Sequence, residues 1–484
     1  MILRRVLIAN RGEIALRILR TCRRLGVEAV LAASDADLAS VPARLADRVV
    51  RLGPPPPSAS YLDVDAVIAA AKTAGVDAVH PGYGFLSENQ RLARACAEAG
   101  IVFIGPTVDQ LAAVGDKLEA RRHAIAAGLP VVPGGPLDDT ADAARLAAEI
   151  GFPLLIKAVG GGGGRGMKQV HDPAALASTI DLAVAEAGAA FGDPRVYLER
   201  FVATGRHVEV QLIADGENVV HLGTRDCSVQ RRYQKLIEEA PAPALDPVLR
   251  EEMHRAAVAL GKHLEYRGLG TVEFLVDVDR GIFYFLEMNA RIQVEHPVTE
   301  AVTGLDLVAE QLAVAEGRTL SFGQADVSFT GHAIECRINA EDWARDFQPS
   351  PGTINDAVWP LGEGIRVDTH LQAGATVPPY YDSLLAKLIV HGRDRAEALT
   401  RLHGALGRCA IDGVTTNVPM HQAVLEDAEF TEGGVDTAWF TRFLRDHPVT
   451  VPTGVAGSAA ATGSAEAPGV IEAAGSMAAG GSRG

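Results

Sequence analysis

The first 114 residues alternate short apolar runs with stretches whose apolar positions follow helical spacing. Residues 6–9, 28–34, 78–81 and 101–105 are apolar runs of strand length, and residues 14–25 have the pattern of an amphipathic helix. Strands that alternate with helices are typical of βαβ units on a parallel sheet. We therefore expect residues 1–114 to form one α/β domain.

The rest of the chain divides into two further folded regions and a tail. Residues 115–330 hold a run of glycines, several charged strand patterns and a hairpin, whereas residues 331–447 are strand-rich and close on helical patterns. Residues 448–484 contain no Leu and no aromatic residue, and such a composition buries too little apolar surface to offset the entropy of folding. We expect a multidomain α/β and α+β protein with a disordered Ala- and Gly-rich tail.

Charge and cysteine content argue against several classes of protein. The 45 Lys and Arg residues against 61 Asp and Glu leave a net charge of −16, whereas nucleic-acid binding needs a basic face. No apolar run reaches the roughly 18 residues of a membrane span, and Arg11 and Glu13 interrupt any signal-peptide core. The five cysteines are far apart, with no C-x-x-C pair, so we expect a reducing, cytoplasmic environment and no zinc site.

The run of five glycines at residues 160–164 is the first candidate for chemistry. It follows a strand pattern at 154–158, and a second strand begins near Val170. A glycine-rich turn lets backbone N–H groups approach an anion closely, and Lys157, Arg165 and Lys168 add positive charge. The segment is not a P-loop, because no G-x-x-x-x-G-K-[ST] string precedes a helix. We interpret it as a mobile phosphate cover, and the alternative is a flexible hairpin tip.

Two β-rich runs, residues 271–277 and 282–289, predict a hairpin with two facing carboxylates. A three-residue loop at 279–281 would place Gly281 at the position with positive φ, and residues whose numbers sum to 560 would then pair. Glu273 would face Glu287, and like charges directly opposite each other are destabilising. A divalent cation between them, with Asn289 on the same face, explains the pair best and suits Mg²⁺. The alternative, a solvated polar face, is disfavoured by the apolar neighbours.

The same alternation continues past this hairpin. If the chain stays extended, Arg291, Gln293 and Glu295 lie on the face of Glu287, and the His-Pro pair at 296–297 ends the strand. A cation, an amide and a carboxylate beside a metal site could bind a small anion and move a proton. A separate segment, residues 225–235, carries four cations and is either part of an anion site or a solvated charge run.

Taken together, these motifs resemble biotin carboxylase, the ATP-grasp component of biotin-dependent acyl-CoA carboxylases. The resemblance runs from residue 2 to residue 445. The strings that carry it are IANRGEI at 8–14, HPGYGFLSEN at 80–89, GDK at 115–117, the glycine run at 157–166, RHVE at 206–209, residues 225–235, EMNARIQVEHP at 287–297, ECRIN at 335–339 and PPYYDS at 378–383.

The resemblance implies both a fold and a reaction. The expected domains are an N-terminal Rossmann-like domain at 1–114, an ATP-grasp domain at 115–330 and a C-terminal domain at 331–447. In this family ATP phosphorylates bicarbonate to carboxyphosphate with Mg²⁺ or Mn²⁺, and N1′ of biotin captures the CO₂. The family's A/V-M-K-M attachment motif is absent here, so biotin is expected on a separate carboxyl-carrier protein. Carboxyltransferase subunits and a second copy of the chain are the other implied partners.

The resemblance also implies roles for individual residues. The ATP contacts would come from Lys117, Lys157, Gly161, Gly162, Gly163, Gly164, Gly166, Glu199, His207, Gln230 and Leu275. The metal ligands would be Glu273, Glu287 and Asn289. Bicarbonate would be held by Lys235, Arg291, Gln293 and Val294. The catalytic set would be Glu295 as the base, Arg337 at the biotin enolate, and Lys235 and Arg291.

The same residues are less consistent with three alternative functions. Another ATP-grasp ligase, joining an acyl phosphate to an amine, should lack Arg337 and the RIQVE string, and both are intact. A catalytically inactive nucleotide-binding regulator should have lost Lys235, Glu295 or a metal carboxylate. A dinucleotide oxidoreductase would need G-x-G-x-x-G after the first strand, where the chain has NRGEI. One departure from the family is Tyr233, where many relatives have His or another polar residue.

Overall fold

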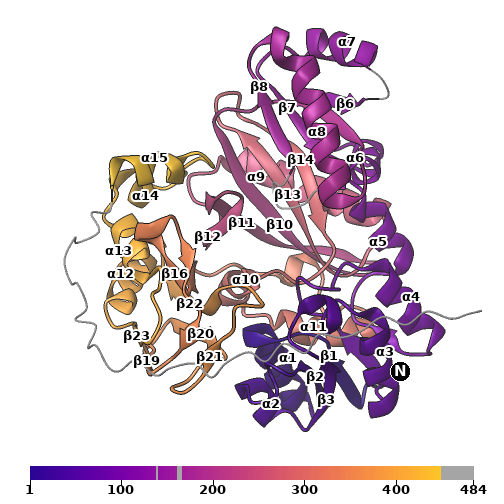
Figure 1. Ribbon diagram of the computed structural model, residues 1–484, viewed down its shortest axis with the longest axis vertical. Helices are drawn as coiled ribbons and strands as arrows, with labels where there is room; N and C mark the ends of the chain where they lie inside the picture. The colour runs from indigo at the N-terminus through magenta and orange to yellow at the C-terminus, as the bar shows by residue number, and fades with distance from the viewer. Residues whose placement is uncertain (138–139, 161–165, 449–484) are drawn as a thin grey trace, which may run out of the picture. The chain divides into compact units, whose positions relative to one another are not determined.

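A parallel five-stranded sheet organises the N-terminal residues of the structure, a computed structural model that describes residues 1–137, 140–160 and 166–448 (Figure 1). Its order is β3-β2-β1-β4-β5, and every neighbouring pair is parallel. The strands are β1 (Arg5–Ile8), β2 (Glu28–Ser34), β3 (Arg48–Gly53), β4 (Ala78–His80) and β5 (Val102–Phe103). Between them lie α1 (Gly12–Leu25), α2 (Val41–Leu45), η1 (Pro57–Ala59), α3 (Val64–Ala74) and α4 (Gln90–Glu98). The predicted alternation of strands and helices on a parallel sheet is confirmed.

The turn from β1 into α1 shows how local sequence builds this unit. The Asn10 side-chain amide donates to the carbonyls of Pro81 at 2.7 Å and Tyr83 at 2.8 Å, which ties the end of β1 to the loop after β4. Gly12 begins the helix with a φ of +67°, a conformation that L side chains rarely adopt, and Gly26 ends it at +71°.

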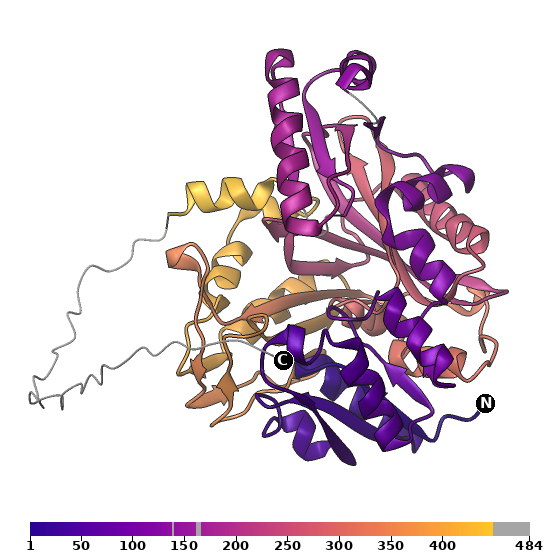
Figure 2. The ribbon, with the colours of Figure 1, turned by 45° about the vertical axis from the view of Figure 1, so that its right-hand side comes forward.

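A second sheet holds the strands on both sides of the glycine run. It is antiparallel, with the order β6-β9-β7-β8, and α7 and α8 pack on it (Figure 2). The elements are β6 (Gly134–Pro136), α7 (Thr140–Ile150), β7 (Leu154–Ala158), β8 (Met167–Val170), η2 (Pro173–Ala175), α8 (Leu176–Phe191) and β9 (Val196–Arg200). The predicted strand at 154–158 is confirmed, whereas the second strand ends at Val170 and does not begin there. Residues 161–165 lie outside the described residues, so the phosphate cover stays a prediction.

One segment of the described chain, Pro173–Phe191, is long and apolar enough to cross a membrane by length and mean hydropathy alone. It carries Asp181 and Glu186, and Glu186 pairs with Lys168 of β8 at 3.0 Å. Its inner face buries Ile180 against the sheet. A helix with one buried face and charged residues is typical of a packed domain, so the segment is weak evidence for a membrane span.

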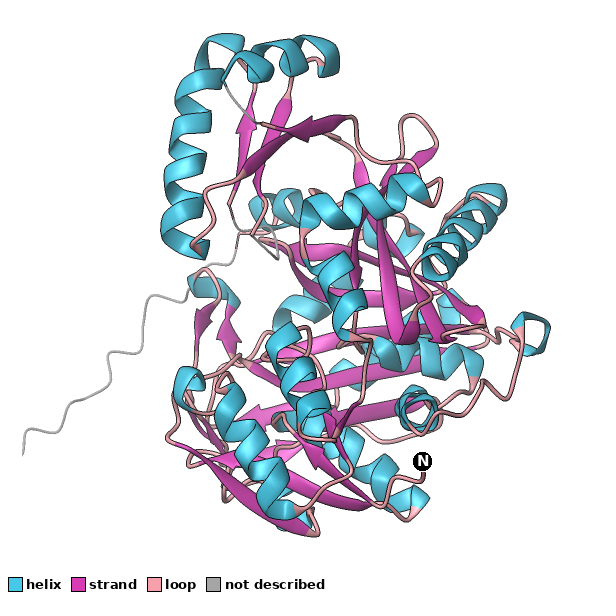
Figure 3. Cartoon of the chain, turned by 90° about the vertical axis from the view of Figure 1, so that its right-hand side faces the viewer, coloured by secondary structure: helices cyan, strands magenta, loops and turns pink. Residues whose placement is uncertain are grey.

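An eight-stranded antiparallel sheet supplies most strands of the candidate site; its strands run across the middle of Figure 3. The order is β14-β13-β10-β11-β12-β15-β22-β20. The strands are β10 (Gly205–Asp215), β11 (Val219–Arg231), β12 (Gln234–Ala240), β13 (Arg267–Asp277), β14 (Ile282–Asn289), β15 (His332–Asn339), β20 (Ile365–Thr369) and β22 (Leu384–Gly392). Because β12 pairs with β15, this ladder crosses the predicted boundary at 330/331.

Helices pack on this sheet from several parts of the chain. Helix α9 contacts β10 and β11, whereas α10 and α12 contact β15 and β22. The helices are α5 (Val108–Gly115), α6 (Lys117–Ala126), α9 (Pro247–His263), α10 (His296–Thr303), α11 (Leu307–Ala315), α12 (Arg395–Leu406), α13 (Val418–Leu425), α14 (Ala428–Glu432) and α15 (Trp439–Asp446). The short elements are η3 (Gln324–Asp326), β16 (Glu341–Asp342), η4 (Trp343–Arg345), β17 (Gln348–Pro349), β18 (Gly352–Thr353), β19 (Asp356–Val358), β21 (Thr376–Val377) and β23 (Ala410–Asp412). Residues 449–484, the predicted disordered tail, lie outside the described residues.

The β13–β14 hairpin confirms the predicted facing carboxylates but corrects the predicted loop. Glu273 lies directly opposite Glu287, as the sum of 560 requires. The register shifts between Glu273 and Phe274, however, so that Asp277 pairs with Ile282. The loop therefore has four residues, 278–281, and the three-residue loop was wrong. A local irregularity in the ladder absorbs the extra residue, while Gly281 still takes a positive φ of 61°.

Candidate functional site

Lys235 of β12 lies at the centre of three buried carboxylates. Its Nζ is 2.7 Å from Glu209, 3.0 Å from Glu273 and 2.7 Å from Glu295. Burial alone would lower the pKa of the ammonium, but Cys227 and the three carboxylates raise it well above its usual range. Lys235 is therefore a fixed positive charge that joins β10, β13 and the segment before α10.

Glu295 is held between two cations. Its second oxygen is 3.0 Å from the guanidinium of Arg337, which also contacts Glu238 at 2.5 Å. Although burial opposes ionisation, Lys235 and Arg337 lower the pKa of Glu295. The side chain is almost completely buried, so the structure presents an ionised carboxylate shielded from water. Such a group can accept a proton from a substrate that displaces one of the two cations.

The predicted extended face beyond Asn289 was wrong, although its side chains still converge. The strand ends at Asn289, and His296 and Pro297 begin α10 instead of ending a strand. Pro is compatible with the first turn of a helix because that turn needs no N–H from it. The turn before α10 brings Gln293 and Glu295 back onto the site, where Gln293 donates to Glu273 at 3.0 Å.

The facing carboxylates of the hairpin provide an oxygen set that fits a divalent cation. Burial, and then Glu273 across the ladder, raise the pKa of Glu287. Among the described residues, none donates a hydrogen bond to the Glu287 carboxylate or forms an ion pair with it. Glu273 is held by Lys235 and by His207, whose Nε2 lies 3.0 Å away. An unpartnered carboxylate beside a second one, with the Asn289 oxygen on the same strand, suits Mg²⁺.

Five of the predicted nucleotide contacts lie on α6, β7, β9, β10 and β13. Lys117 begins α6, and burial lowers its pKa, with Glu287, Lys157 and Glu199 as its charged neighbours. Lys157 of β7 contacts Glu199 of β9 at 2.5 Å. Leu275 is the ladder partner of His207. The structure therefore brings two lysines, one carboxylate and one apolar side chain to the same region.

The structure describes two of the six remaining predicted ATP contacts. Gln230 is buried on β11 and donates to the Cys227 carbonyl at 3.2 Å. Gly166 has a φ of +74°, and a Cβ there would lie 2.9 Å from the Cβ of Ala158. Gly161, Gly162, Gly163 and Gly164 lie outside the described residues.

The predicted bicarbonate residues are close to Glu295, but several are already engaged. Arg291 contacts Glu88 at 2.8 Å and Asn289 at 2.5 Å. The Val294 carbonyl accepts a hydrogen bond from Lys387 at 3.0 Å. An anion at this place would have to use the remaining N–H donors of Arg291 or displace Glu88.

The basic segment at 225–235 is not an open anion site. Arg225 is completely buried, and its guanidinium donates to Glu209 at 2.6 Å. Arg231 and Arg232 both contact Asp346, at 2.6 Å and 3.0 Å. Of the four cations, Lys235 and Arg225 contact the carboxylate cluster, whereas Arg231 and Arg232 pair with Asp346.

Several residues of the site could not be found from local patterns. Each of them lies on a different element from the residue that it contacts, and they are Glu88, Glu209, Glu238 and Lys387. Glu209 lies two residues from His207 on β10 and therefore on the same face of that strand.

Comparison with known proteins assigns the whole described fold. Three family models match: "Biotin carboxylase, N-terminal domain" over residues 2–111, "Carbamoyl-phosphate synthase L chain, ATP binding domain" over 116–322, and "Biotin carboxylase C-terminal domain" over 335–442. The biotin carboxylase of Pseudomonas aeruginosa is 51% identical over 446 residues, which cover 91% of this chain and 99% of that protein.

Solved structures give the same result. A biotin carboxylase–β,γ-ATP complex from Campylobacter jejuni has a TM-score of 0.88 and 44% identity, covering 91% of this chain and 99% of that chain. The biotin carboxylase domain dimer of a Hydrogenobacter thermophilus 2-oxoglutarate carboxylase, in complex with MgADP, ADP and bicarbonate, has a TM-score of 0.87 and 42% identity, covering 93% and 98%. The chain therefore has the three-domain architecture predicted from its motifs, and it belongs to the biotin carboxylase family of ATP-grasp ligases.

Proposed function

We propose that this chain carboxylates biotin on a separate carboxyl-carrier protein, using ATP and bicarbonate, in the first half-reaction of an acyl-CoA carboxylase. The observation that carries the proposal is the buried Glu295 carboxylate, held between Lys235 and Arg337. An ionised carboxylate, two cations and a nearby pair of carboxylates that could hold a metal are the groups that this chemistry needs. Solved structures of relatives contain β,γ-ATP in one case, and MgADP, ADP and bicarbonate in another.

The nucleotide and the metal occupy the hairpin side of the site in this proposal. Lys117 and Lys157 neutralise phosphate charge, while Glu199, His207, Gln230 and Leu275 contact the rest of ATP and the glycine loop closes over it. Mg²⁺ or Mn²⁺, held by Glu273, Glu287 and Asn289, supplies charge neutralisation on the phosphates when bound. The unpartnered Glu287 supports this assignment, because a cation there offsets its repulsion from Glu273.

Bicarbonate occupies the Glu295 side. Lys235 and Arg291 hold the anion together with Gln293 and the Val294 backbone. Glu295 accepts its proton as the bicarbonate oxygen attacks the γ-phosphorus and ADP leaves. A weak nucleophile gains most from such positioning beside a base. The carboxyphosphate then breaks into CO₂ and phosphate, the phosphate accepts the N1′ proton of biotin, and N1′ forms the bond to CO₂. Arg337 stabilises the biotin enolate, because a planar guanidinium matches the charge that develops on the ureido oxygen.

A substitution at Glu295 tests the proposal. In the wild-type protein, ADP release should require bicarbonate and rise with free biotin. Glu295→Gln should lower that turnover at least about 100-fold while ATP binding, measured by calorimetry, stays nearly unchanged. Glu217→Gln, at an exposed position, is the matched control and should retain full activity. ADP release that needs an amine and ignores biotin would refute the proposal.

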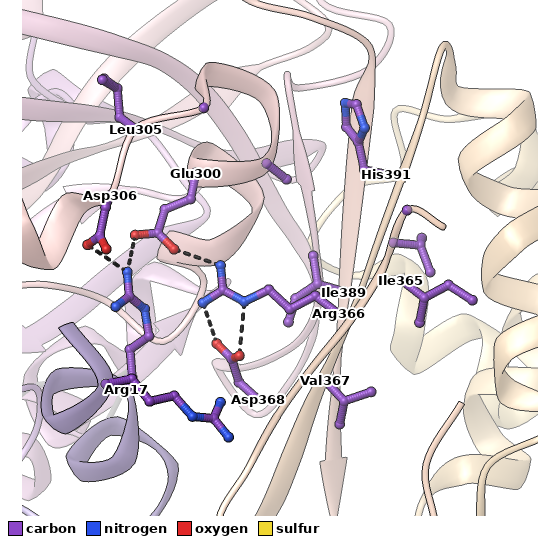
Figure 4. A pocket seen from close by; sticks show the side chains of 15 residues that line it. Arg17, Glu300, Leu305, Asp306, Ile365, Arg366, Val367, Asp368, Ile389 and His391 are labelled. Atoms are coloured by element: carbon purple, nitrogen blue, oxygen red, sulfur yellow. Dashed lines mark hydrogen bonds and ion pairs between the residues drawn. The ribbon is translucent and has the colours of Figure 1, made fainter. Parts of the chain in front are cut away.

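A polar pocket of about 600 Å³ supports a homodimer (Figure 4). Arg366 contacts Glu300 at 2.7 Å and Asp368 at 2.6 Å, and Arg17 contacts Glu300 at 2.6 Å. Leu361, a few residues before Arg366, is 84% exposed. We propose that a second copy covers this surface, as the domain dimer of the H. thermophilus relative suggests. Sedimentation should give a dimer, and Leu361→Asp should shift it toward monomer.

The remaining assignments are also proposals. The carboxyl carrier and the carboxyltransferase subunits are the expected partners, and the cytoplasm is the expected location. The domain limits 1–114, 115–330 and 331–447 fall at the end of α5 and just before β15.

A further inference from the structure

Two buried carboxyl groups face each other behind Arg337. Glu238 of β12 and Glu335 of β15 are direct partners in the antiparallel ladder, and both are completely buried. Directly opposite side chains in such a ladder have Cβ atoms about 4.5–5.5 Å apart, and like charges at that separation are destabilising. Neither residue is needed for the contacts of ATP, the metal or bicarbonate described above.

The cations near this pair are already engaged. Arg337 donates to Glu238 at 2.5 Å and to Glu295 at 3.0 Å. Lys387 of β22 lies 3.1 Å from Glu13 and 3.8 Å from Asp368, and it donates to the Val294 carbonyl. In the part of the chain that the structure describes, neither oxygen of Glu335 has a hydrogen-bond partner, and one oxygen of Glu238 also lacks one.

A carboxylate in this position cannot remain charged at low energetic cost. An ionised group taken out of water without a partner becomes neutral by a pKa shift. Burial raises the pKa of Glu335 well above its usual range, and it raises that of Glu238 to about 7 against the opposing effect of Arg337. The charged groups that face Glu335 are Lys387, Glu238, Arg337 and Glu295. Two carboxyls in one site titrate as a pair, with one proton held strongly.

We propose that Glu238 and Glu335 share one proton, carried mainly by Glu335, and that Glu335 thereby acts as a positioning residue for Arg337. With the proton in place, Arg337 faces two carboxylates, Glu238 and Glu295, which fix its orientation. Without it, a third negative charge lies behind the guanidinium and weakens the positive potential that it offers to an enolate. The kinetic consequence rests on the proposed role of Arg337 toward biotin, whereas the shared proton does not.

Infrared spectroscopy of the full chain tests the shared proton without using activity. The wild-type protein at neutral pH should show the carbonyl stretch of a protonated carboxylic acid, and Glu335→Gln should remove it. Glu217→Gln, at the exposed position, should leave the band unchanged. A wild-type spectrum without the band, or a band that survives in Glu335→Gln, would overturn the proposal. If Glu335→Gln fails to fold, Glu335→Asp keeps the acid and should shift the band.

The pH profile of kcat/KM for biotin tests the positioning role. In the wild type, this ratio should fall at alkaline pH as the shared proton leaves. Glu335→Gln cannot lose that proton, so its alkaline fall should be absent, while at neutral pH its kcat/KM should stay within about threefold of wild type. Glu238→Gln removes the partner of Arg337 and should raise KM for biotin much more than KM for ATP. An unchanged alkaline fall in Glu335→Gln would overturn the role. A wild type with no biotin-dependent ADP release would instead refute the proposed function, and the infrared result would then decide the shared proton.

Discussion

Replacing Lys235 with Met should remove the charge balance at the centre of the site. Met keeps most of the aliphatic stem but removes the ammonium that lies within 3.0 Å of Glu209, Glu273 and Glu295. Removing one partner of a buried ion pair costs about 3–5 kcal/mol, because the remaining charge stays buried without compensation. The carboxylates keep one other basic neighbour each: Arg225, His207 and Arg337. We therefore expect the unfolding free energy to fall by an amount at the lower end of this range, about 3 kcal/mol at neutral pH.

The pH dependence of this loss has a definite sign. In the wild type, although burial opposes it, Lys235 and Arg225 lower the pKa of Glu209 to about 2. A lowered pKa stabilises the folded state above the unfolded-state pKa, and this contribution is lost only as pH falls through about 2. Without Lys235, burial and mutual repulsion raise the pKa values of the cluster. A carboxyl group whose pKa is raised in the folded state stabilises that state below its unfolded-state pKa, and this stability is lost as pH rises. The difference in unfolding free energy between wild type and variant should therefore become smaller as pH is lowered from about 8 to about 5.

Urea and thermal unfolding at several pH values measure both quantities. Lys72→Met, at an exposed position, is the matched control and should stay within about 0.5 kcal/mol of wild type at every pH. A deficit below about 1 kcal/mol at neutral pH would mean that the carboxylates are already stabilised by other groups. A deficit that stays constant as pH is lowered would refute the assignment of the loss to uncompensated carboxylates.

Three other substitutions should separate the roles of neighbouring groups. Glu287→Gln should raise the metal-free unfolding free energy by about 1 kcal/mol, because it removes repulsion from Glu273, while weakening Mg²⁺-dependent nucleotide binding in calorimetry. If Glu287→Gln lowered the unfolding free energy equally with and without Mg²⁺, this prediction would be contradicted. Gly166→Ala should cost about 1–3 kcal/mol, since φ is +74° and its Cβ would lie 2.9 Å from Ala158, with Gly192→Ala as an uncrowded positive-φ comparison. Arg225→Lys keeps the charge beside Glu209 but leaves buried acceptors unpaired, so the urea midpoint should fall by the equivalent of about 2–4 kcal/mol; an unchanged midpoint would contradict this.

Local sequence patterns predicted the helices and strands that depend mainly on neighbouring residues. The strand at Glu28–Ser34 and helix α1 have the periodicity of their structures. The pairing of Glu273 with Glu287 followed from the position of the turn glycine, although the loop length was one residue short. The ladder irregularity beside Phe274 has no local signal, because it depends on how the whole strand pairs.

The rest of the site depends on contacts between distant residues. Glu88 reaches Arg291 from the N-terminal region, more than 200 positions away, and Lys387 reaches the Val294 carbonyl from β22. No periodicity records such contacts. The strand predicted through His296 failed for a different reason. A Pro after a polar residue is compatible both with the end of a strand and with the first turn of a helix, and tertiary packing of α10 decided between them.

The ladder between β12 and β15 also limits how the chain can be divided. Lys235 and Glu238 lie three residues apart on β12, so one strand connects the bicarbonate side of the proposed site with the support of Arg337. A cut at residue 330 would separate the family domains but would expose two long unpaired strand edges, one on each fragment. Open edges promote aggregation and mispairing. Circular permutation or fusion of this enzyme should therefore use the surface loops elsewhere, since its catalytic halves fold as a single hydrogen-bonded sheet.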